Sequence, residues 1–570
     1  MTSLDLLVPI RGYVEKMTEE VPGLKVMLLD DDTSGMVSMV LSNSEIISKE
    51  VFLIESLRIF DNREEMQHLK CIVYVRPTEE NISLLTRELR RPNYGEYHLY
   101  FSNIIPRDLL QRLAEADERE VVRRCEEYYG DVYVQAPHAF SLRISPTAVG
   151  ERTTQGILSA LLAVKRRPTA VRYQRNSTAC QGLASSIAQT MSKELELFTF
   201  KHGACCLLIV DRWEDAVTPL LLPWTYQAML HEYIGLDRNL VVLDKSETRS
   251  QKKVEDNEFV LSSLLDPFYA KQMYSNWGEI CVATKELADT YQSTVSRKEE
   301  LQKGGSSLDD VKALMQAMPD VMRVKGSVSK HLSLVLDIRE KMRQRGGLID
   351  VGQLEQDIAC NQNHTEHWRQ LVDVIASSAK SSPEDVVRVA MIYYLRYEKH
   401  PSFNLTRLCD LLSTSGISQS LIDRLSALKN RCSADNRQST KLLFPEDNPM
   451  NPRGLLKIVK GAVMGMESET NVYAQHEPLL KTLVAQLGRG ILSPDLYPNV
   501  TGLPGQTPYT EKVREVIVFV VGGATYEEVA TVHTINKGGA TLAGSKTEID
   551  VKVVLGSTEI INIQRFMQMI

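Results

Sequence analysis

The sequence of 570 residues lacks any stretch that could cross a membrane, and it lacks the marks of secretion. Its longest apolar runs, VIVFVV and ACCLLIV, are far short of the roughly 20 residues that span a bilayer. The first residues, MTSLDLLVPIRGYVEKM, have no basic segment ahead of an apolar core, so we expect no signal peptide. The nine cysteines form no CxxC pair, which is typical of buried thiols in a reducing compartment. We expect a soluble, cytoplasmic protein that associates with membranes only through partners.

The motifs of common enzymes are also missing. A Walker A loop needs a lysine directly after its last glycine, but in GGATLAGSKT Ser545 separates Gly544 from Lys546. Asp211, after the apolar run CCLLIV, resembles a Walker B carboxylate, but without a phosphate loop a metal there would have no substrate. The sequence contains no HExxH and no GxSxG. We predict no catalytic residue, no cofactor and no metal site. With a net charge of -7, we also predict no nucleic-acid partner.

The hydrophobic pattern divides the chain into four segments. In residues 1–136, short apolar runs such as CIVYVRP alternate with segments of helical spacing, which predicts a mostly parallel sheet covered by helices. Residues 137–245 repeat this pattern, and residues 246–470 show almost only helical periodicity. Residues 471–570 return to strands and helices. We predict an α/β plus α fold, in which the helical domain is inserted into the second of two α/β domains and residues 471–570 complete that domain's sheet.

The segment VIVFVVGGATYEE joins one predicted strand to one predicted helix. Gly522 and Gly523 lack the lysine or the third glycine of a nucleotide-binding turn, so we predict a close-packed structural joint. Thr525 can cap the following helix, because Glu528 stands three positions later, as in a capping box.

Several long stretches together resemble the Sec/Munc (SM) family of SNARE-binding proteins. They are ERTTQGILSALLAVKRRPTAVRY, DRWEDAVTPLLLPWTYQAMLHEYIG, MPDVMRVKGSVSKHLSLV, LEQDIACNQN and VIVFVVGGATYEE. The resemblance covers nearly the whole chain. It implies a three-domain arch without catalytic activity or cofactor. A closed syntaxin or a SNARE bundle is expected to lie in a central cleft between domains 1 and 3a. ELRRPNY, LAEADEREVV and DIACNQNH resemble the branch of the family that serves trans-Golgi and endosomal membranes.

The resemblance implies a pocket on domain 1 for the N-terminal peptide of a syntaxin-type SNARE. The matching segment is IIPRDLLQRLAEADEREVVRRCEEYYGD, which we interpret as two helices. Leu110 is expected to be the exposed wall of the pocket, whereas core and contact roles both stay open for Leu113 and Cys125. The predicted contact residues are Leu109, Leu110 and Leu113 from the first helix, and Val122, Cys125 and Glu126 from the second.

The resemblance also implies a helical hairpin, with its tip near residues 310–335, that bends back or extends to bind the vesicle SNARE. Pro319 matches the family's hinge proline, and proline disfavours helix at the residue before it. Leu332 matches a vesicle-SNARE contact, and Val328 and Val335 would extend its apolar stripe. The alternative is an ordinary helix break with a buried stripe.

The implied partners are a syntaxin-type Qa-SNARE, bound by its N-peptide and SNARE domain, a vesicle SNARE and the assembled SNARE bundle. We expect a monomer that associates peripherally with trans-Golgi, endosomal and vesicle membranes. Two other functions stay open at this point, a nucleotide-binding enzyme of the NTPase type and a scaffold without SNARE specificity. Magnesium-dependent nucleotide binding would favour the first, and a pull-down without syntaxin-type SNAREs would favour the second.

Overall fold

The structure is a computed structural model that divides the chain into two compact units. Unit 1 comprises Met1–Ala216, Asp435–Leu443 and Glu477–Ile561, and unit 2 comprises Val217–Ala434, Phe444–His476 and Asn562–Ile570. The structure describes residues 4–59, 63–145, 149–200, 204–243, 258–303, 308–346, 348–376, 382–444, 475–501, 512–542 and 547–570, without the side chains of 294–303, 308–325, 349, 350 and 441.

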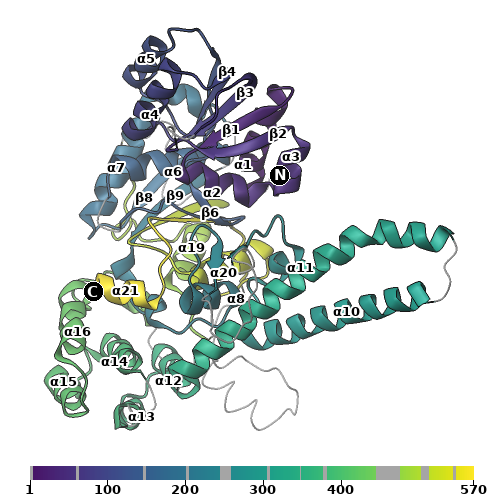
Figure 1. The fold of residues 1–570 in the computed structure, drawn as a ribbon. Helices are drawn as coiled ribbons and strands as arrows, with labels where there is room; N and C mark the ends of the chain where they lie inside the picture. Colours follow the sequence, from purple (N-terminus) through teal and green to yellow (C-terminus); the bar gives the residue numbers. More distant parts are fainter. Residues whose placement is uncertain are drawn as a thin grey trace. The chain divides into compact units, whose positions relative to one another are not determined.

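Five parallel strands form the first sheet of unit 1, in the order β2-β1-β3-β4-β5 (Figure 1). The helices α1, α2 and α3 share one core with Met27 and Ile72, and α4 and α5 share another with Val26 and Val73. Since successive residues of a strand point to opposite faces, the two helix groups cover opposite faces of the sheet. The elements are α1 (Leu7–Glu20), β1 (Lys25–Leu29), α2 (Asp31–Val40), α3 (Asn43–Ser48), β2 (Val51–Ser56), β3 (Met66–Val75), α4 (Glu79–Arg90), β4 (Tyr94–Phe101), α5 (Arg107–Ala116) and β5 (Val122–Glu127).

The second sheet of unit 1 combines strands from distant parts of the chain. Its order is β6-β7-β13-β12-β9-β8, and all neighbours are parallel except β6 and β7. The late strand β12 lies between β9 and β13, with Val516 paired to both Cys206 and Val553. The elements are β6 (Tyr133–Ala136), β7 (Ala139–Ser141), α6 (Glu151–Ala163), β8 (Ala170–Tyr173), α7 (Thr178–Lys193), η1 (Leu195–Phe198), β9 (Cys205–Asp211), η2 (Arg212–Glu214), α17 (Thr440–Leu443), α19 (Leu479–Arg489), β12 (Glu515–Val521), α20 (Tyr526–Lys537) and β13 (Lys552–Ser557).

Unit 2 is built mainly from helices. The central helix α14 is buried around its whole circumference from Asp385 to Leu395, as expected for a helix enclosed by others. The long helices α10 and α11 lie side by side as a hairpin (Figure 1). The elements are η3 (Thr218–Leu220), α8 (Tyr226–Met229), η4 (Leu230–Ile234), β10 (Leu240–Val242), β11 (Glu258–Val260), α9 (Pro267–Gln272), α10 (Trp277–Lys303), α11 (Leu308–Arg345), α12 (Leu348–Cys360), α13 (His364–Ala376), α14 (Pro383–Tyr397), α15 (Leu405–Thr414), α16 (Gln419–Cys432) and α21 (Ile563–Met569).

The predicted α/β plus α fold class is confirmed. Two mostly parallel sheets are present, and a large helical segment lies between two strands of the second sheet in the sequence. The proposed boundaries at residues 136, 245 and 470 stay predictions.

The two glycines after β12 form the predicted joint. Gly522 and Gly523 have φ angles of 96° and 100°, in the region where a side chain is strained. A Cβ on Gly522 would lie 2.8 Å from the Cβ of Arg212, so this turn packs directly against η2. Thr525 and Glu528 then form the expected capping box at the start of α20.

Candidate interaction surfaces

The helix α5 presents one leucine to solvent and buries two others. Leu109 and Leu113 lie in the core beneath the helix, whereas Leu110 is 39% exposed. Arg112 donates a hydrogen bond of 2.6 Å to Glu79 of α4. Because Leu110 and Arg112 lie on opposite sides of the buried face at 100° per residue, Leu110 points away from α4. Leu110 therefore has the exposure predicted for it, and Leu109 and Leu113 can only support that surface from below.

The second predicted helix of this segment is instead the strand β5, so that prediction was wrong. The carboxylate of Asp117 accepts the N–H groups of Val121 and Val122, and Glu120 has a φ of 54°, so the chain turns sharply after α5. Two adjacent β-branched valines then favour an extended chain. The spacing of Val122, Cys125 and Glu126 that resembled a helix is a coincidence of sequence.

The strand places these three residues on two different faces. Cys125 pairs with Leu99, which belongs to the core under α4 and α5, so Cys125 is on the α5 side, where it is exposed. Val122 is half-buried against the same core. Glu126 pairs with Tyr100 and lies 4.0 Å from Lys16 of α1, which places it on the opposite face. Glu126 therefore cannot share a contact surface with Leu110.

The helix α11 runs from Leu308 to Arg345 without interruption, so the backbone at Pro319 is helical. A proline inside a helix removes one backbone hydrogen bond and disfavours helix at the preceding residue. The hairpin is thus in its extended form in this structure. The side chains near its tip, including that of Pro319, lie outside the described residues.

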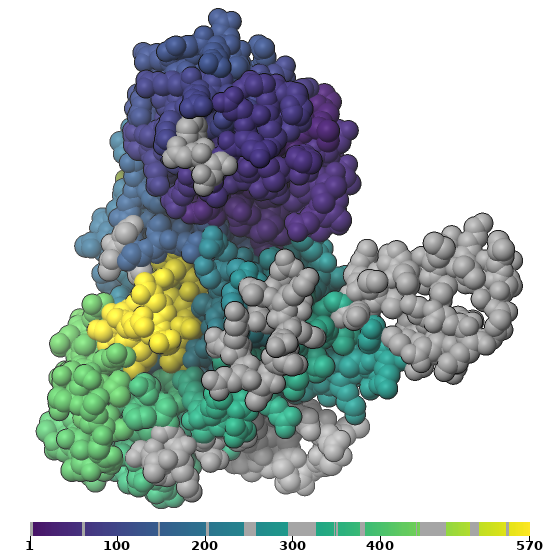
Figure 2. Space-filling view, viewed as in Figure 1, coloured from purple at the N-terminus to yellow at the C-terminus, as the bar shows by residue number. Residues whose placement is uncertain are grey.

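The C-terminal half of α11 separates the predicted apolar stripe into buried and exposed residues. Val328 and Val335 are buried beside Leu334 and Ile338, so their predicted role as contact residues does not hold in this conformation. Leu332 is 39% exposed, and Leu336, one turn later, is 43% exposed. This part of the hairpin reaches the surface in Figure 2, where it is teal. We call the pair Leu332 and Leu336 the α11 stripe.

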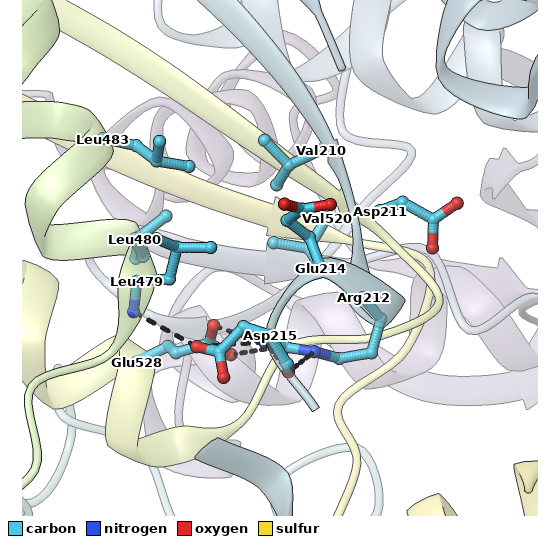
Figure 3. Close-up of a pocket in the computed structure, with 10 residues that line it drawn as sticks. All are labelled: Val210, Asp211, Arg212, Glu214, Asp215, Leu479, Leu480, Leu483, Val520 and Glu528. Atoms are coloured by element: carbon cyan, nitrogen blue, oxygen red, sulfur yellow. Dashed lines mark hydrogen bonds and ion pairs between the residues drawn. The ribbon is translucent and has the colours of Figure 1, made fainter. Parts of the chain in front are cut away.

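The carboxyl edge of the second sheet is filled by its own ion pairs (Figure 3). Arg212 donates to both carboxylate oxygens of Glu528, at 2.9 and 2.7 Å, and to the backbone carbonyl of Asp215. Asp211 accepts from Ser177 and from the N–H of Trp213, so both of its oxygens have donors. The remaining cavity of about 20 Å³ holds little more than one water molecule. A nucleotide does not fit into this cavity.

Neither a metal centre nor a membrane span was found in the part of the chain that the structure describes. No group of three or more His, Cys, Asp or Glu side chains is placed there to hold a metal ion. Among the same residues, every helix is too short or too polar to cross a bilayer. In the segment GGATLAGSKT, which was compared with a Walker A loop, residues 543–546 lie outside the described residues.

Comparison with known proteins identifies the family. The model of the Sec1 family matches residues 25–569. The chain belongs to the Sec1 family. The resemblance to SM proteins that its motifs predicted is therefore confirmed.

Relatives cover almost the whole chain. Vacuolar protein sorting-associated protein 45 (Vps45) of Rattus norvegicus is 38% identical over 576 residues, which span 99% of this chain and 96% of the relative. The protein of the same name from Saccharomyces cerevisiae is 30% identical and spans 96% and 94%. The solved SM protein Vps45 in complex with the Qa SNARE Tlg2 has a TM-score of 0.82, 34% identity and coverage of 99% and 97%. Sly1p in complex with an N-terminal peptide of Sed5p has a TM-score of 0.74 over 100% and 98% of the chains, but its 17% identity shows the fold alone.

For this Sec1-family chain, sequence reasoning missed Leu336 and the polar groups that hold α11. Leu336 could have been found, because it stands four positions after Leu332 on the same helix. Arg345 at the end of α11 binds Glu232 at 2.9 Å and Asp385 at 2.8 Å. His331 bonds to Asp266 and Tyr226. These partners lie far apart in the sequence, so no local pattern indicates them.

Proposed function

We propose that this chain binds a syntaxin-type Qa-SNARE and templates or regulates SNARE complex assembly in vesicle fusion at trans-Golgi and endosomal membranes, without catalysing a reaction. The observation that carries the proposal is the likeness along the whole chain to Vps45, which has been solved with a Qa SNARE bound. The nucleotide-binding alternative gains no support from the family or from the filled edge of the second sheet. The chain acts as a monomer and reaches membranes through its SNARE partners.

The N-terminal peptide of the Qa-SNARE lies against α5 and β5 of unit 1. Leu110 of α5 and Cys125 of β5 are exposed there, and Val122 of β5 is half-buried against the core of unit 1. Leu109 and Leu113 form the floor, and Glu126 stands outside the surface. An aliphatic peptide side chain seated on Leu110 contributes about 1.5–3 kcal/mol of binding free energy.

The vesicle SNARE lies along the hairpin of unit 2. SNARE motifs form coiled coils, and a coiled-coil helix presents apolar residues at spacings of three and four. Leu332 and Leu336 offer a matching pair four residues apart. The hairpin residues on the N-terminal side of Gly326 would extend this contact, with Pro319 as the hinge.

The first experiment uses the full chain as bait in a cell extract and identifies the captured SNAREs. We expect one syntaxin-type Qa-SNARE and one vesicle SNARE. Capture that retains other proteins but no syntaxin-type SNARE would overturn the proposed function and favour the scaffold.

The second experiment separates the two surfaces with one charge substitution in each. Leu110→Arg should weaken binding of the captured Qa-SNARE's N-terminal peptide by about 10- to 150-fold and leave vesicle-SNARE binding unchanged, because it replaces the aliphatic contact. Leu332→Arg should do the reverse. Leu195→Arg in unit 1 and Leu264→Arg in unit 2 are matched controls, since these leucines are 42% and 39% exposed. Titration calorimetry measures all affinities, and the melting temperature of each variant should stay near that of the wild type. An unchanged peptide affinity in Leu110→Arg would refute the α5 surface.

A further inference from the structure

A buried chain of hydrogen bonds ties the middle of α11, at His331, to the helices α8 and α9. Nδ1 of His331 lies 2.9 Å from the hydroxyl of Tyr226 on α8, and Nε2 lies 3.0 Å from Oδ2 of Asp266. Asp266 is also the N-cap of α9, where its Oδ1 accepts the N–H of Tyr269 at 3.0 Å. All three side chains are buried. One carboxylate therefore ties the start of α9 to the middle of α11.

The charges around the ring determine the direction of these bonds. Burial is the largest influence on His331 and lowers its pKa, although the hydrogen bond and charge of Asp266 act in the opposite direction. The ring is therefore neutral at pH 7. Burial opposes ionisation of Asp266, but the hydrogen bond from His331 and the ion pair with Lys330, the preceding residue, lower the pKa of Asp266 and keep its carboxylate ionised. A neutral ring facing a carboxylate donates from Nε2 and accepts the Tyr226 hydroxyl at Nδ1. Each polar atom of the His331 ring thus has one partner and one role.

Aromatic rings restrict the orientation of the imidazole further. The ring of Phe268 lies 4.6 Å from that of His331, and the ring of Tyr269 is nearly parallel to it at 6.4 Å. A hydrogen bond weakens steeply when its angle departs from linear, whereas apolar contacts such as those of Val328 and Ile338 have no preferred direction. His331 therefore resists rotation of this part of α11 about its axis.

Rotation matters because of where the α11 stripe begins. Leu332 follows His331 directly and lies about 100° around the helix from it. Leu332 is partly exposed, while Val328 and Val335, which lie between His331 and Leu332 around the helix, are buried. A rotation by a fraction of one residue step would move Leu332 toward the interior or Val335 toward solvent.

We propose that His331, held by Asp266 and Tyr226, is a positioning residue that sets the rotation of α11 and so exposes Leu332 and Leu336 to a partner helix. The role in partner binding rests on the proposed function, whereas the control of exposure does not.

The exposure can be tested without any partner by hydroxyl-radical footprinting of the full chain. His331→Leu removes both hydrogen bonds, and Tyr226→Phe removes one with the smallest change in volume. We expect labelling of Leu332 and Leu336, relative to Leu195 of unit 1, to change by at least about twofold in His331→Leu and by less in Tyr226→Phe. His331→Gln, whose amide can donate to Asp266 and accept from Tyr226, should restore the wild-type pattern. If His331→Leu does not fold, Tyr226→Phe decides. Unchanged labelling in the folded variants would overturn the proposal.

The link to binding is tested by a double-mutant cycle. The probe is a synthetic peptide with the SNARE motif of the captured vesicle SNARE. His331→Leu should weaken the affinity for the probe by about tenfold in the wild-type chain and by less than about twofold in a Leu332→Ala chain. The effects of two substitutions are not additive when one residue acts through the other. An equal loss in both chains would show that His331 acts only on stability and would overturn its positioning role. A wild-type chain that does not bind the probe, but whose footprint still depends on His331, would refute the vesicle-SNARE function and leave the control of exposure standing.

Discussion

Leu110 and Leu332 are both 39% exposed, but the two helices that carry them are held in different ways. The inner face of α5 consists of Leu109, Leu113 and Ala116 in an apolar core, and its ion pair between Arg112 and Glu79 lies at the exposed rim. The C-terminal half of α11 also buries apolar residues, but in addition it buries His331 and ends in the ion pairs of Arg345.

The two helices differ in how firmly their surroundings fix which side chains face solvent. Apolar packing tolerates small rotations, because its free energy depends mainly on the area removed from water. Buried hydrogen bonds and ion pairs have defined geometry, and the loss of one partner leaves the other unsatisfied at a high cost. The α5 surface should therefore tolerate changes of charge and pH nearby, and the α11 stripe should not.

The largest expected effect comes from removing the ionic end of α11. Arg345→Ala leaves Glu232 buried without its arginine, and breaking a buried pair costs about 3–5 kcal/mol of unfolding free energy. We expect a lower melting temperature and lost hydrogen-exchange protection in α11 and α14, with the N-peptide affinity of unit 1 unchanged. Arg343→Ala is the matched control, because among the described residues Arg343 forms an ion pair with Glu340 alone, on the surface of the same turn. Equal melting temperatures for both variants would contradict the distinction between the helices.

A smaller effect is expected from acid. The folded pKa of His331 is lowered by burial below its usual value near 6.5, so the unfolded chain takes up the proton first as pH falls. Its contribution to stability is complete above about pH 6.5 and is lost as pH falls from there toward the lowered folded pKa. Between pH 7 and pH 5, exchange protection of residues 326–345 should fall, after correction for intrinsic rates, while that of α5 stays constant. His331→Gln should remove most of this loss of protection at low pH. Equal protection of residues 326–345 at pH 7 and pH 5 in the wild type would contradict the proposed difference between α5 and α11.

Local patterns allowed much of the fold to be predicted. The alternation of short apolar runs with amphipathic segments predicted both mostly parallel sheets, because the central strands are buried on both faces and the helices on one. The joint at Gly522 was recognisable because its capping box, Thr525 to Glu528, spans four residues.

The candidate surfaces were harder to predict, because exposure depends on partners far away in the sequence. The helical interpretation of Val122 to Glu126 failed because a turn at Glu120 and pairing with β4 outweighed the apparent spacing. The sequence assigned Val328 and Val335 to one face with Leu332, because both valines lie only a small angle from Leu332 around the helix. That small angle is enough to separate buried from exposed side chains. The network around His331 decides which of them faces the interior, and Asp266 lies 65 residues away.

The smallest effect is expected at Pro319. A substitution there tests whether the hairpin can also bend at this residue, beyond the part of α11 that His331 holds in place. Proline in a helix interior is about 3 kcal/mol less favourable than alanine, so Pro319→Ala should stabilise the extended form that the structure shows. Because apparent affinity can rise only by the inverse of the fraction already extended, we expect a gain of a few fold in vesicle-SNARE affinity and a matching acceleration of fusion between reconstituted liposomes. Gly326→Ala should act in the same direction by less, about 1 kcal/mol at most, since an added Cβ there meets no atom within 4 Å. Leu332→Arg in the Pro319→Ala chain should abolish the gain. Binding and fusion at wild-type levels in Pro319→Ala would refute the hinge. The contacts of His331 would then remain as the feature that determines the exposure of the α11 stripe.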